Sequence, residues 1–345
     1  MTSIVSELYQ HKGQNWLGAN TKRKQIGTLN LSSLLAGAAT HSLFVRFTNQ
    51  GLRILNSIAL KQIELRQMNE DSIVSFLAPE EIALSADFLQ NGFVVCDAES
   101  PKILESIRHD VTQISTNWLK RNQLESNAFD LSISHNFVAN ERLNDLRLTI
   151  FTELNKIADI RKRYFWLAQQ SIEILVGNEL SMQNKVNMSI QQPNDESSVL
   201  PMHSDIWTGD SPFQVVLWVP LTDALKSNSM FFLPPNESHE ARQRVAAGEF
   251  KSMDQIESEY HSQMITMIVP YGKVLIFDSN CLHGNVLNET KTARWSINCR
   301  FTGLLTPFTN PERRLGTYYL PITTRAATKM GLSILNAQEA SSNGE

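Results

Sequence analysis

The chain has 345 residues, of which 42% are hydrophobic, and its formal net charge is -4 at pH 7. This length suits one large domain with additions or two smaller domains, with enough apolar residues for a substantial core. The slightly acidic balance excludes the strongly basic proteins that bind nucleic acid or anionic membranes through their overall charge.

Cysteine usage and the absence of long apolar runs indicate the compartment. The chain contains Cys96, Cys281 and Cys299 and no Cys-x-x-Cys pair, which favours a reducing cytoplasm over a disulfide-bonded secreted protein. The first residues lack the basic and apolar stretches of a secretory signal, and no window approaches about 18 consecutive apolar residues. We therefore expect a cytoplasmic protein without a membrane span.

Residues 1–78 differ in pattern from the rest of the chain. They combine short apolar clusters with polar breaks, and the segment up to Arg66 holds eight Lys or Arg residues against two Asp or Glu. No acid–base or metal-binding arrangement is evident there. We predict a mainly helical N-terminal extension of unknown role, with a solvated or partner-facing basic surface.

A helix–strand–helix pattern follows. Pro79 with two acidic residues predicts a helix start, and Asn91-Gly92 predicts its end. Residues 93–96 form a strand-like run, and Ser100-Pro101 begins an amphipathic helix of about 18 residues. Two more helical stretches are expected within residues 140–178.

From about residue 184 the pattern changes to short β-rich runs separated by turn residues. Residues 238–262 are helical and charged, which predicts an insertion, and the tail 337–345 is expected to fray. Helices followed by strands indicate an α+β protein with a barrel or jelly-roll core. The predicted strands are 186–192, 213–221, 230–233, 264–269, 273–277 and 294–301.

The strongest chemical signal is His203-Ser204-Asp205, followed by His283. On a strand, His203 and Asp205 share one face while Ser204 points away, and His283 follows another strand-like run. The chain is expected to turn after His283 at Gly284-Asn285. Two imidazoles and a carboxylate can hold ferrous iron and leave three positions open, although an isolated His-x-Asp is more often a satisfied polar pair.

Arg294 and Ser296 lie on one face of the last predicted strand, shortly after His283. A guanidinium binds a carboxylate through two hydrogen bonds, and a hydroxyl two residues further can donate a third. Alone, Arg294 would be read as a solvated cation on an edge strand. The preceding His-x-Asp and His283 favour a binding role instead.

These residues resemble the Fe(II)/2-oxoglutarate-dependent dioxygenases, whose core is a double-stranded β-helix. His203, Asp205 and His283 match the iron ligands of that family. Arg294 and Ser296 match the residues that hold the distal carboxylate of 2-oxoglutarate. The resemblance implies Fe(II), 2-oxoglutarate as cosubstrate and O2, with Asp205 favouring hydroxylation over halogenation.

Two further similarities narrow the family. Residues 89–95 with Ser100-Pro101 are similar to the phytanoyl-CoA dioxygenase-like branch, and 233–239 resemble its Pro-Gly-Ser-His turn with the glycine replaced. Residues 201–205 look like those of 2-oxoglutarate oxygenases from bacterial surface-carbohydrate gene clusters. Gln191, on the strand before the iron motif, is a candidate to reach the oxo acid.

The resemblance covers about residues 80–310 and implies a catalytic domain over 79–320, with the insertion at 238–262 and a C-terminal segment at 321–345. The implied fold is α+β, a jelly-roll or cupin-like core flanked by helices. The implied reaction is hydroxylation of a small molecule, such as a carbohydrate or surface-polysaccharide precursor, coupled to decarboxylation of 2-oxoglutarate to succinate and CO2.

Two other classes remain open. One is a cupin-type, non-oxidative metalloenzyme such as an isomerase or epimerase, which shares the barrel but ordinarily does not need Arg294 with Ser296. The other is a non-catalytic barrel that acts as a binding module, which the complete set of site residues disfavours. The oligomeric state is not indicated by the sequence.

Overall fold

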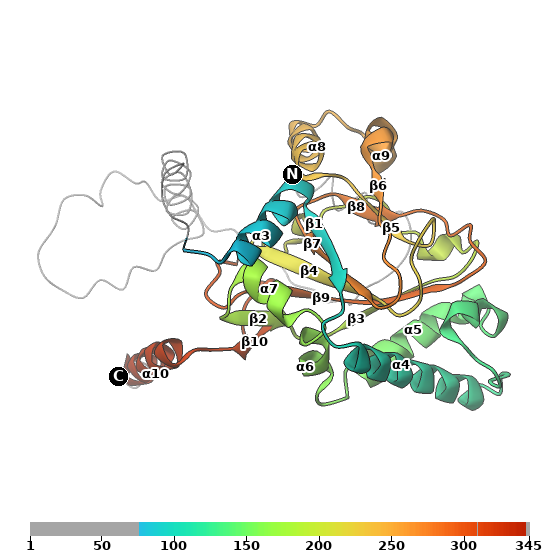
Figure 1. Ribbon diagram of the computed structural model, residues 1–345, viewed down its shortest axis with the longest axis horizontal. Helices are drawn as coiled ribbons and strands as arrows, with labels where there is room; N and C mark the ends of the chain where they lie inside the picture. Colours follow the sequence, from blue (N-terminus) through green and yellow to red (C-terminus); the bar gives the residue numbers. More distant parts are fainter. Residues whose placement is uncertain (1–75, 309, 343–345) are drawn as a thin grey trace, which may run out of the picture. The chain divides into compact units, whose positions relative to one another are not determined.

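Helices and antiparallel strands make up the computed structural model, which describes residues 76–308 and 310–342 (Figure 1). The helices are α3 (Pro79–Asn91), α4 (Pro101–Arg121), α5 (Asn140–Leu154), α6 (Ile160–Phe165), α7 (Gln169–Val176), α8 (Pro235–Ala247), α9 (Met253–Tyr260) and α10 (Ala326–Ser342). The strands are β1 (Phe93–Asp97), β2 (Leu180–Gln183), β3 (Asn187–Gln191), β4 (Gln214–Pro220), β5 (Met230–Phe232), β6 (Ile265–Thr266), β7 (Lys273–Asp278), β8 (His283–Asn285), β9 (Arg294–Gly303) and β10 (Tyr319–Thr323).

The strands form two antiparallel sheets. The larger has the order β1-β7-β4-β9-β2-β10, with β3 also paired to β9, and the smaller has the order β6-β5-β8. Strands far apart in the chain are therefore neighbours in space, as in the pairing of Gln191 with Arg294. These long-range pairings bring the candidate site residues together.

One face of the larger sheet packs against α4, α5, α6 and α7 (Figure 1). Because successive residues of a strand point to opposite faces, alternate residues of β9 enter this core. Trp295 and Phe301 are fully buried there beside Tyr164 of α6, whose hydroxyl donates to the carbonyl oxygen of Leu217 at 2.7 Å. Because the apolar face of β9 packs on the helices, its other face points towards the smaller sheet.

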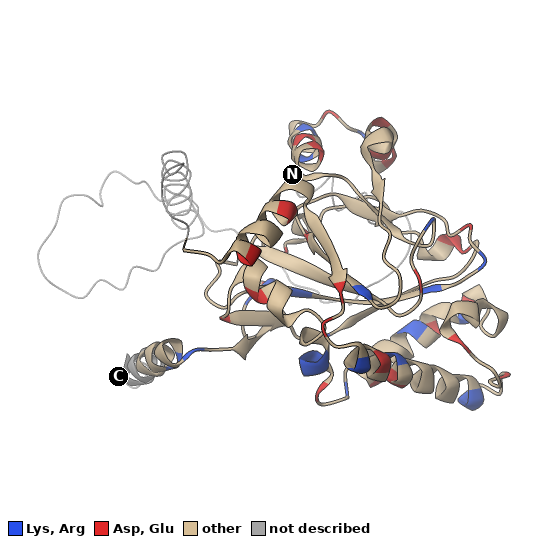
Figure 2. Ribbon diagram, viewed as in Figure 1, with Lys and Arg blue, Asp and Glu red and all other residues tan. Residues whose placement is uncertain are grey.

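The opposite face of the larger sheet meets the smaller sheet. Phe232 of β5 and Phe277 of β7 belong to one buried apolar cluster, with ring centroids 6.0 Å apart in an edge-to-face arrangement. The polar residues of β9 lie on this side, because they alternate with the buried residues of the helix-facing core. Figure 2 shows that most charged residues lie on helices and connecting segments, so the arginines of β9 are unusual in the sheet.

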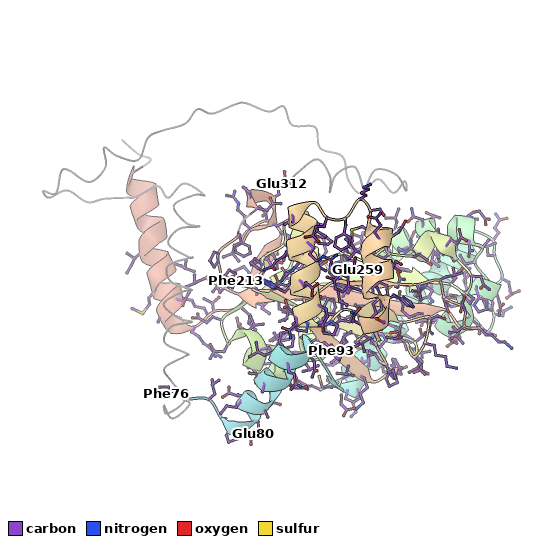
Figure 3. All side chains as sticks on the ribbon, turned by 90° about the horizontal axis from the view of Figure 1, so that it is seen from above. Phe76, Glu80, Phe93, Phe213, Glu259 and Glu312 are labelled. Atoms are coloured by element: carbon purple, nitrogen blue, oxygen red, sulfur yellow. The ribbon has the colours of Figure 1, made fainter. Side chains whose placement is uncertain are left out.

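Several predicted elements are confirmed. Helix α3 begins at Pro79, and Gly92 ends it in the left-handed conformation with φ of 76°. Helix α4 begins at Pro101, and β1, β3, β4, β5, β7 and β9 fall where strands were expected. The charged segment 238–262 is occupied by α8 and α9, which lie side by side (Figure 3).

Other expectations are corrected. Three helices, not two, occupy residues 140–178, and the strand expected at 264–269 shrinks to the two residues of β6. The boundary expected at residue 321 falls inside β10, which pairs with β2 in the larger sheet. Helix α10 continues to Ser342, where the sequence predicted a frayed tail.

Two further findings bear on the predicted extension and on membrane association. Of the extension expected over residues 1–78, residues 1–75 lie outside the described residues. Within 76–308 and 310–342, no helix combines the length and the apolar character needed to cross a membrane.

Gly284 does not turn the chain after His283, as the sequence predicted, but lies inside strand β8. A Cβ atom at this position would lie 2.7 Å from the Phe231 ring and 2.8 Å from the carbonyl oxygen of Leu200. Glycine is needed here because two neighbouring segments approach the backbone closely, so a local turn signal was the wrong interpretation.

Candidate active site

His203, Asp205 and His283 converge in space, with one potential ligand atom from each within 4.8 Å of the others. Asp205 Oδ1 lies 3.7 Å from His203 Nε2 and 4.0 Å from His283 Nε2. Within the described residues, this is the only group of three or more His, Cys, Asp or Glu side chains placed to share a metal ion.

The two histidines are aligned by their own backbones. His203 and His283 form an antiparallel bridge, in which each backbone N–H donates to the other carbonyl oxygen at 2.9 Å. The side-chain Nδ1 atoms lie 2.9 Å from the carbonyl oxygen of Pro201 and 3.0 Å from that of Cys281, respectively. A proton on Nδ1 satisfies each carbonyl, which leaves both Nε2 lone pairs facing Asp205.

Asp205 reaches the site from a different local structure than expected. It is the first residue of the 3-10 helix η4 (Asp205–Thr208) and not a strand residue, so strand alternation does not explain its direction. Ser204 points away, as predicted, and its hydroxyl lies 3.2 Å from the carbonyl oxygen of Ser279. The tight turn after His203, and not strand alternation, therefore directs the Asp205 carboxylate towards the two histidines.

The electrostatics keep Asp205 and His283 in the forms that bind metal. Burial alone would raise the pKa of Asp205, but the positive charge of Arg300 and the two imidazoles lower it to about 2. Burial lowers the pKa of His283 to about 4, so its imidazole is neutral at pH 7. Neutral imidazoles and a carboxylate are the donor set that ferrous iron accepts, and these residues therefore fit Fe(II).

The depressed pKa of His283 predicts a pH-dependent stability of the metal-free protein. The unfolded chain binds a proton at His283 near pH 6.5, whereas the folded chain binds it only near pH 4. Stability is therefore fully present above pH 6.5, and lowering the pH towards 4 should cost about 3 kcal/mol of unfolding free energy. Denaturant titrations at several pH values measure this loss. It should shrink in His283→Gln and persist in His239→Gln, which alters an exposed histidine on α8.

Arg294 is buried and surrounded by hydrogen-bond acceptors from two strands, β3 and β9, and from one loop. Its Nη1 donates to Ser296 Oγ at 2.7 Å and to Ser189 Oγ at 3.0 Å, and its Nη2 donates to Gln191 Oε1 at 3.2 Å. Its Nε donates to the carbonyl oxygen of Asn228 at 3.2 Å. These contacts fix the plane of the guanidinium.

The Arg294 cluster can hold an anion. Burial lowers the pKa of Arg294 to about 10, so the side chain keeps its charge at neutral pH. Ser189 and Ser296 accept from the guanidinium, and each hydroxyl therefore has its own proton left to donate to a carboxylate. A buried cation with adjacent hydroxyl donors fits a carboxylate such as the distal end of 2-oxoglutarate.

The three residues predicted to bind the oxo acid lie together, and two further polar residues lie on the same two strands. Gln191 contacts Arg294 and donates from Nε2 to the carbonyl oxygen of Val286 at 2.6 Å, which fixes its amide orientation. Ser189 and Arg300 were missed in the sequence. Both could have been found by extending strand alternation two residues before Gln191 and six residues beyond Arg294.

Strand β9 connects the two parts of the site. Arg294, Ser296 and Arg300 lie on one face, because they alternate with buried residues of the helix-facing core. Arg294 contacts Ser296 at one end of the strand, and Arg300 contacts Asp205 near the other end. Six strand residues span about 20 Å, which leaves room for a small cosubstrate between the two arginines.

The first turn of α8 supports His283 through its backbone. Ser238 Oγ donates to the carbonyl oxygen of Leu233 at 2.7 Å and accepts from the backbone N–H of Leu282 at 2.8 Å. Ser238 belongs to the segment that resembles a Pro-Gly-Ser-His turn, and here it lies inside α8. A segment that resembles a turn in the sequence is therefore partly helical in the structure.

Replacing Ser238 with alanine is expected to lower the free energy of unfolding by about 1–3 kcal/mol, because the buried N–H of Leu282 loses its partner. Urea denaturation measures the change. Ser262→Ala, beyond α9, is the matched control and should stay within about 0.5 kcal/mol of the unaltered protein. Equal stability of both variants would contradict a bridging role for Ser238.

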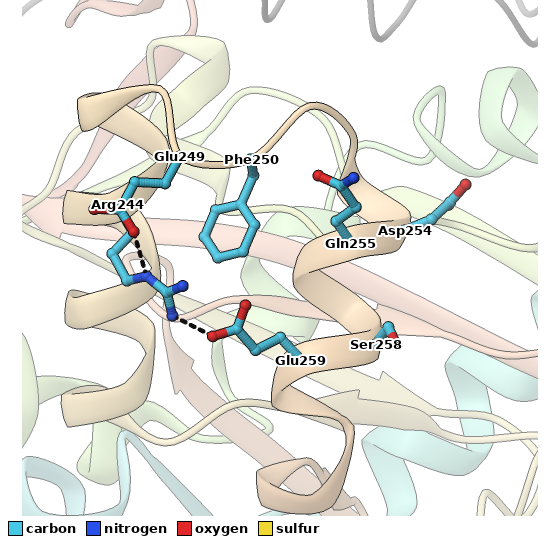
Figure 4. A pocket seen from close by; sticks show the side chains of 7 residues that line it. All are labelled: Arg244, Glu249, Phe250, Asp254, Gln255, Ser258 and Glu259. Atoms are coloured by element: carbon cyan, nitrogen blue, oxygen red, sulfur yellow. Dashed lines mark hydrogen bonds and ion pairs between the residues drawn. The ribbon is translucent and has the colours of Figure 1, made fainter.

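A hollow of about 570 Å³ lies between α8 and α9 and is separate from the metal-binding cluster (Figure 4). Arg244 crosses it and pairs with Glu249 at 2.8 Å and with Glu259 at 2.5 Å. Its lining contains none of the residues that converge at Asp205. The ion pairs stabilise the helical pair and do not form part of the candidate active site.

Comparison with known families matches residues 88–296 to the phytanoyl-CoA dioxygenase family, which is more than half of the chain. The matched segment includes the His203, Asp205 and His283 cluster and ends at Ser296. Among curated proteins, the streptomycin biosynthesis protein StrG of Streptomyces griseus is 30% identical over 99 residues. That match covers 28% of this chain and about a third (35%) of StrG.

Two solved structures illustrate the partial similarity of this fold to known ones. The apo form of the non-heme monooxygenase ThoJ is 15% identical, with a TM-score of 0.48 over 70% of this chain and 84% of that chain. EctD from S. alaskensis, solved with 2-oxoglutarate and 5-hydroxyectoine, is 15% identical, with a TM-score of 0.47 over 69% of this chain and 81% of that chain.

Proposed function

Because this chain belongs to the phytanoyl-CoA dioxygenase family, we propose that it hydroxylates a small molecule, such as a carbohydrate or surface-polysaccharide precursor. By family it is a non-haem Fe(II)- and 2-oxoglutarate-dependent oxygenase, with O2 as the second cosubstrate. The observation that carries the proposal is the convergence of His203, Asp205 and His283 in metal-binding form.

The proposed roles follow from the contacts of each side chain. His203 and His283 bind Fe(II) through Nε2, because their Nδ1 atoms face backbone carbonyls. Asp205 binds through Oδ1, since Arg300 contacts its other oxygen. When bound together, Fe(II), 2-oxoglutarate and O2 supply an oxidant for a C–H bond and release succinate and CO2.

Arg294 and Ser296 are proposed to hold the distal carboxylate of 2-oxoglutarate, while Gln191 orients Arg294. Exclusion of water around Arg294, which is 4% exposed, strengthens its attraction for an anion. A non-oxidative metalloenzyme of the cupin type has no evident need for a buried cation with two adjacent hydroxyls. The Arg294 cluster therefore favours the oxygenase.

Three further features are part of the proposal: the class of substrate, the type of β-sheet core and the cellular location. Similarity of residues 201–205 to oxygenases of carbohydrate gene clusters, and the partial match to a streptomycin biosynthesis protein, support a small biosynthetic intermediate as substrate. Two packed antiparallel sheets support a double-stranded β-helix core. The free thiols of Cys96, Cys281 and Cys299 support a cytoplasmic location.

Succinate release from 2-oxoglutarate tests the function directly. The protein is incubated with Fe(II), O2 and 2-oxoglutarate, with and without candidate nucleotide sugars and small-molecule extracts. We expect succinate that requires Fe(II) and increases with the correct substrate, and we expect none from His203→Gln. His239→Gln should retain full turnover, because His239 lies on α8 outside the cluster. Iron-independent succinate, or full activity of His203→Gln, would refute the proposal.

A further inference from the structure

We propose that Arg300 is a positioning residue that holds one oxygen of Asp205, so that the carboxylate presents a single oxygen to the metal. The proposal concerns the orientation of Asp205 and rests on the proposed metal-binding role of that residue. Arg300 lies on β9, six residues beyond Arg294, and belongs to neither the predicted metal ligands nor the predicted cosubstrate-binding residues.

Two nitrogen atoms of Arg300 converge on one oxygen of Asp205. Nη2 lies 2.8 Å and Nε lies 3.1 Å from Asp205 Oδ2. The other oxygen, Oδ1, faces the imidazoles of His203 and His283. A free carboxylate can bind a metal through one oxygen or both, so this contact selects the first mode and keeps a coordination position available.

Arg300 also contacts side chains other than Asp205. Its Nε lies 3.1 Å from Asp210 Oδ2, and its Nη1 donates to Gln183 Oε1 at 3.3 Å. Asp210 also pairs with Arg313, on the 3-10 helix η6 (Pro311–Arg313). The side chain of Asp210 is fully buried and that of Arg300 is 15% exposed, so the guanidinium has little freedom to leave Asp205.

The charges in this chain of contacts alternate. Asp205 and Asp210 are negative, Arg300 and Arg313 are positive, and the four together are neutral. A lone arginine beside a ligand carboxylate would repel a cation, but Asp210 offsets that repulsion. Arg300 should then affect metal affinity mainly by orienting Asp205, because groups that orient a metal ligand typically change metal affinity by about 10–100-fold.

The Arg300→Lys variant distinguishes the effect of Arg300 on the orientation of Asp205 from the effect of its positive charge. Arg300→Lys keeps the positive charge but replaces the rigid two-nitrogen fork with one flexible ammonium group. Arg300→Gln removes both the charge and the fork. If the fork orients Asp205, the lysine variant should recover only part of the loss seen with glutamine.

The chain offers a closely matched control in Arg163 on α6. Its side chain is 14% exposed, and it pairs with Asp110 at 2.7 Å and with Asp159 at 3.2 Å. It lies among the helices and contacts none of the site residues in the described part of the chain. Arg163→Gln therefore removes a comparable arginine with two carboxylate partners and reports any general loss of stability.

The experiment uses Co(II) as a redox-stable probe with the full-length protein. Its affinity is measured by titration, and its visible absorption reports the number and geometry of the ligands. We expect Arg300→Gln to weaken Co(II) binding by about tenfold or more and to change the visible spectrum. Arg300→Lys should lie between it and the unaltered protein, whereas Arg163→Gln should match the unaltered protein in both readouts.

If Arg300→Gln does not fold, Asp210→Asn loosens Arg300 without altering Asp205 and should change both readouts in the same direction, to a smaller extent. Unaltered affinity and spectrum in every folded Arg300 and Asp210 variant would overturn the positioning role. Full recovery in Arg300→Lys would also overturn it, because charge alone would then suffice. Failure of the unaltered protein to bind Co(II), or binding insensitive to His203→Gln, would instead overturn the metal site itself.

Discussion

Replacing Asp205 with alanine is expected to abolish succinate formation, because the metal loses its only carboxylate ligand among the three converging side chains. The two imidazoles would remain, and two imidazoles alone bind a divalent cation more weakly than two imidazoles with a carboxylate. Succinate measured from 2-oxoglutarate with Fe(II) and O2 should fall to the level of metal-free protein.

Asp205→Ala should lower the stability of the protein much less than it lowers its activity. Arg300 would lose one carboxylate partner but keep Asp210 at 3.1 Å, so its charge is not left unpaired. Asp110→Ala is a suitable control, because Asp110 also pairs with an arginine but lies outside the site. Full turnover by Asp205→Ala, or equal loss in Asp110→Ala, would remove Asp205 from the metal site.

Replacing Arg294 with glutamine is expected to weaken 2-oxoglutarate binding by about 2–5 kcal/mol, or roughly 30-fold or more. The guanidinium is buried, and Ser189 and Ser296 alone would present hydroxyls without the cation. Binding can be followed anaerobically with Fe(II) through the weak visible charge-transfer band that forms when the oxo acid chelates the metal. Fe(II) or Co(II) affinity without the oxo acid should change little.

Arg161→Gln provides the matched control for Arg294. Arg161 is a partly buried arginine whose guanidinium donates to the backbone carbonyl oxygens of Gln183, Met182 and Leu320. Its removal should lower stability without weakening 2-oxoglutarate binding. An Arg294→Gln variant that binds the oxo acid as tightly as Arg161→Gln does would show that the carboxylate binds elsewhere.

Much of the site was predictable because its signals are local in the sequence. Strand alternation correctly placed Arg294 and Ser296 on one face of β9, and Pro79 and Gly92 correctly bounded the first described helix. His203, Asp205 and His283 lie close together, as their residue types led us to expect, although Asp205 belongs to a 3-10 helix and not to a strand. Each of these inferences depends on backbone geometry that neighbouring residues impose.

The expectations that failed depended on contacts between distant segments. Gly284 carries a turn signal, yet it lies in a strand because Leu200 and Phe231 pack against its backbone. Asp205 carries a strand signal, yet the bridge between His203 and His283 is followed at once by a 3-10 turn. No local pattern reports which segment will pack beside such a residue.

By itself, the sequence determined the donor types, the face of β9 that carries the arginine and serine, and the chemistry that these groups can support. Only the tertiary structure decided which oxygen of Asp205 faces the histidines, because Arg300 reaches it from a strand 95 residues away. It also placed Ser189 and Gln191 around Arg294 through the pairing of β3 with β9. Residue type and local periodicity can be read from a short stretch of sequence. The partners of a buried charge depend instead on which distant strands pair in the sheet.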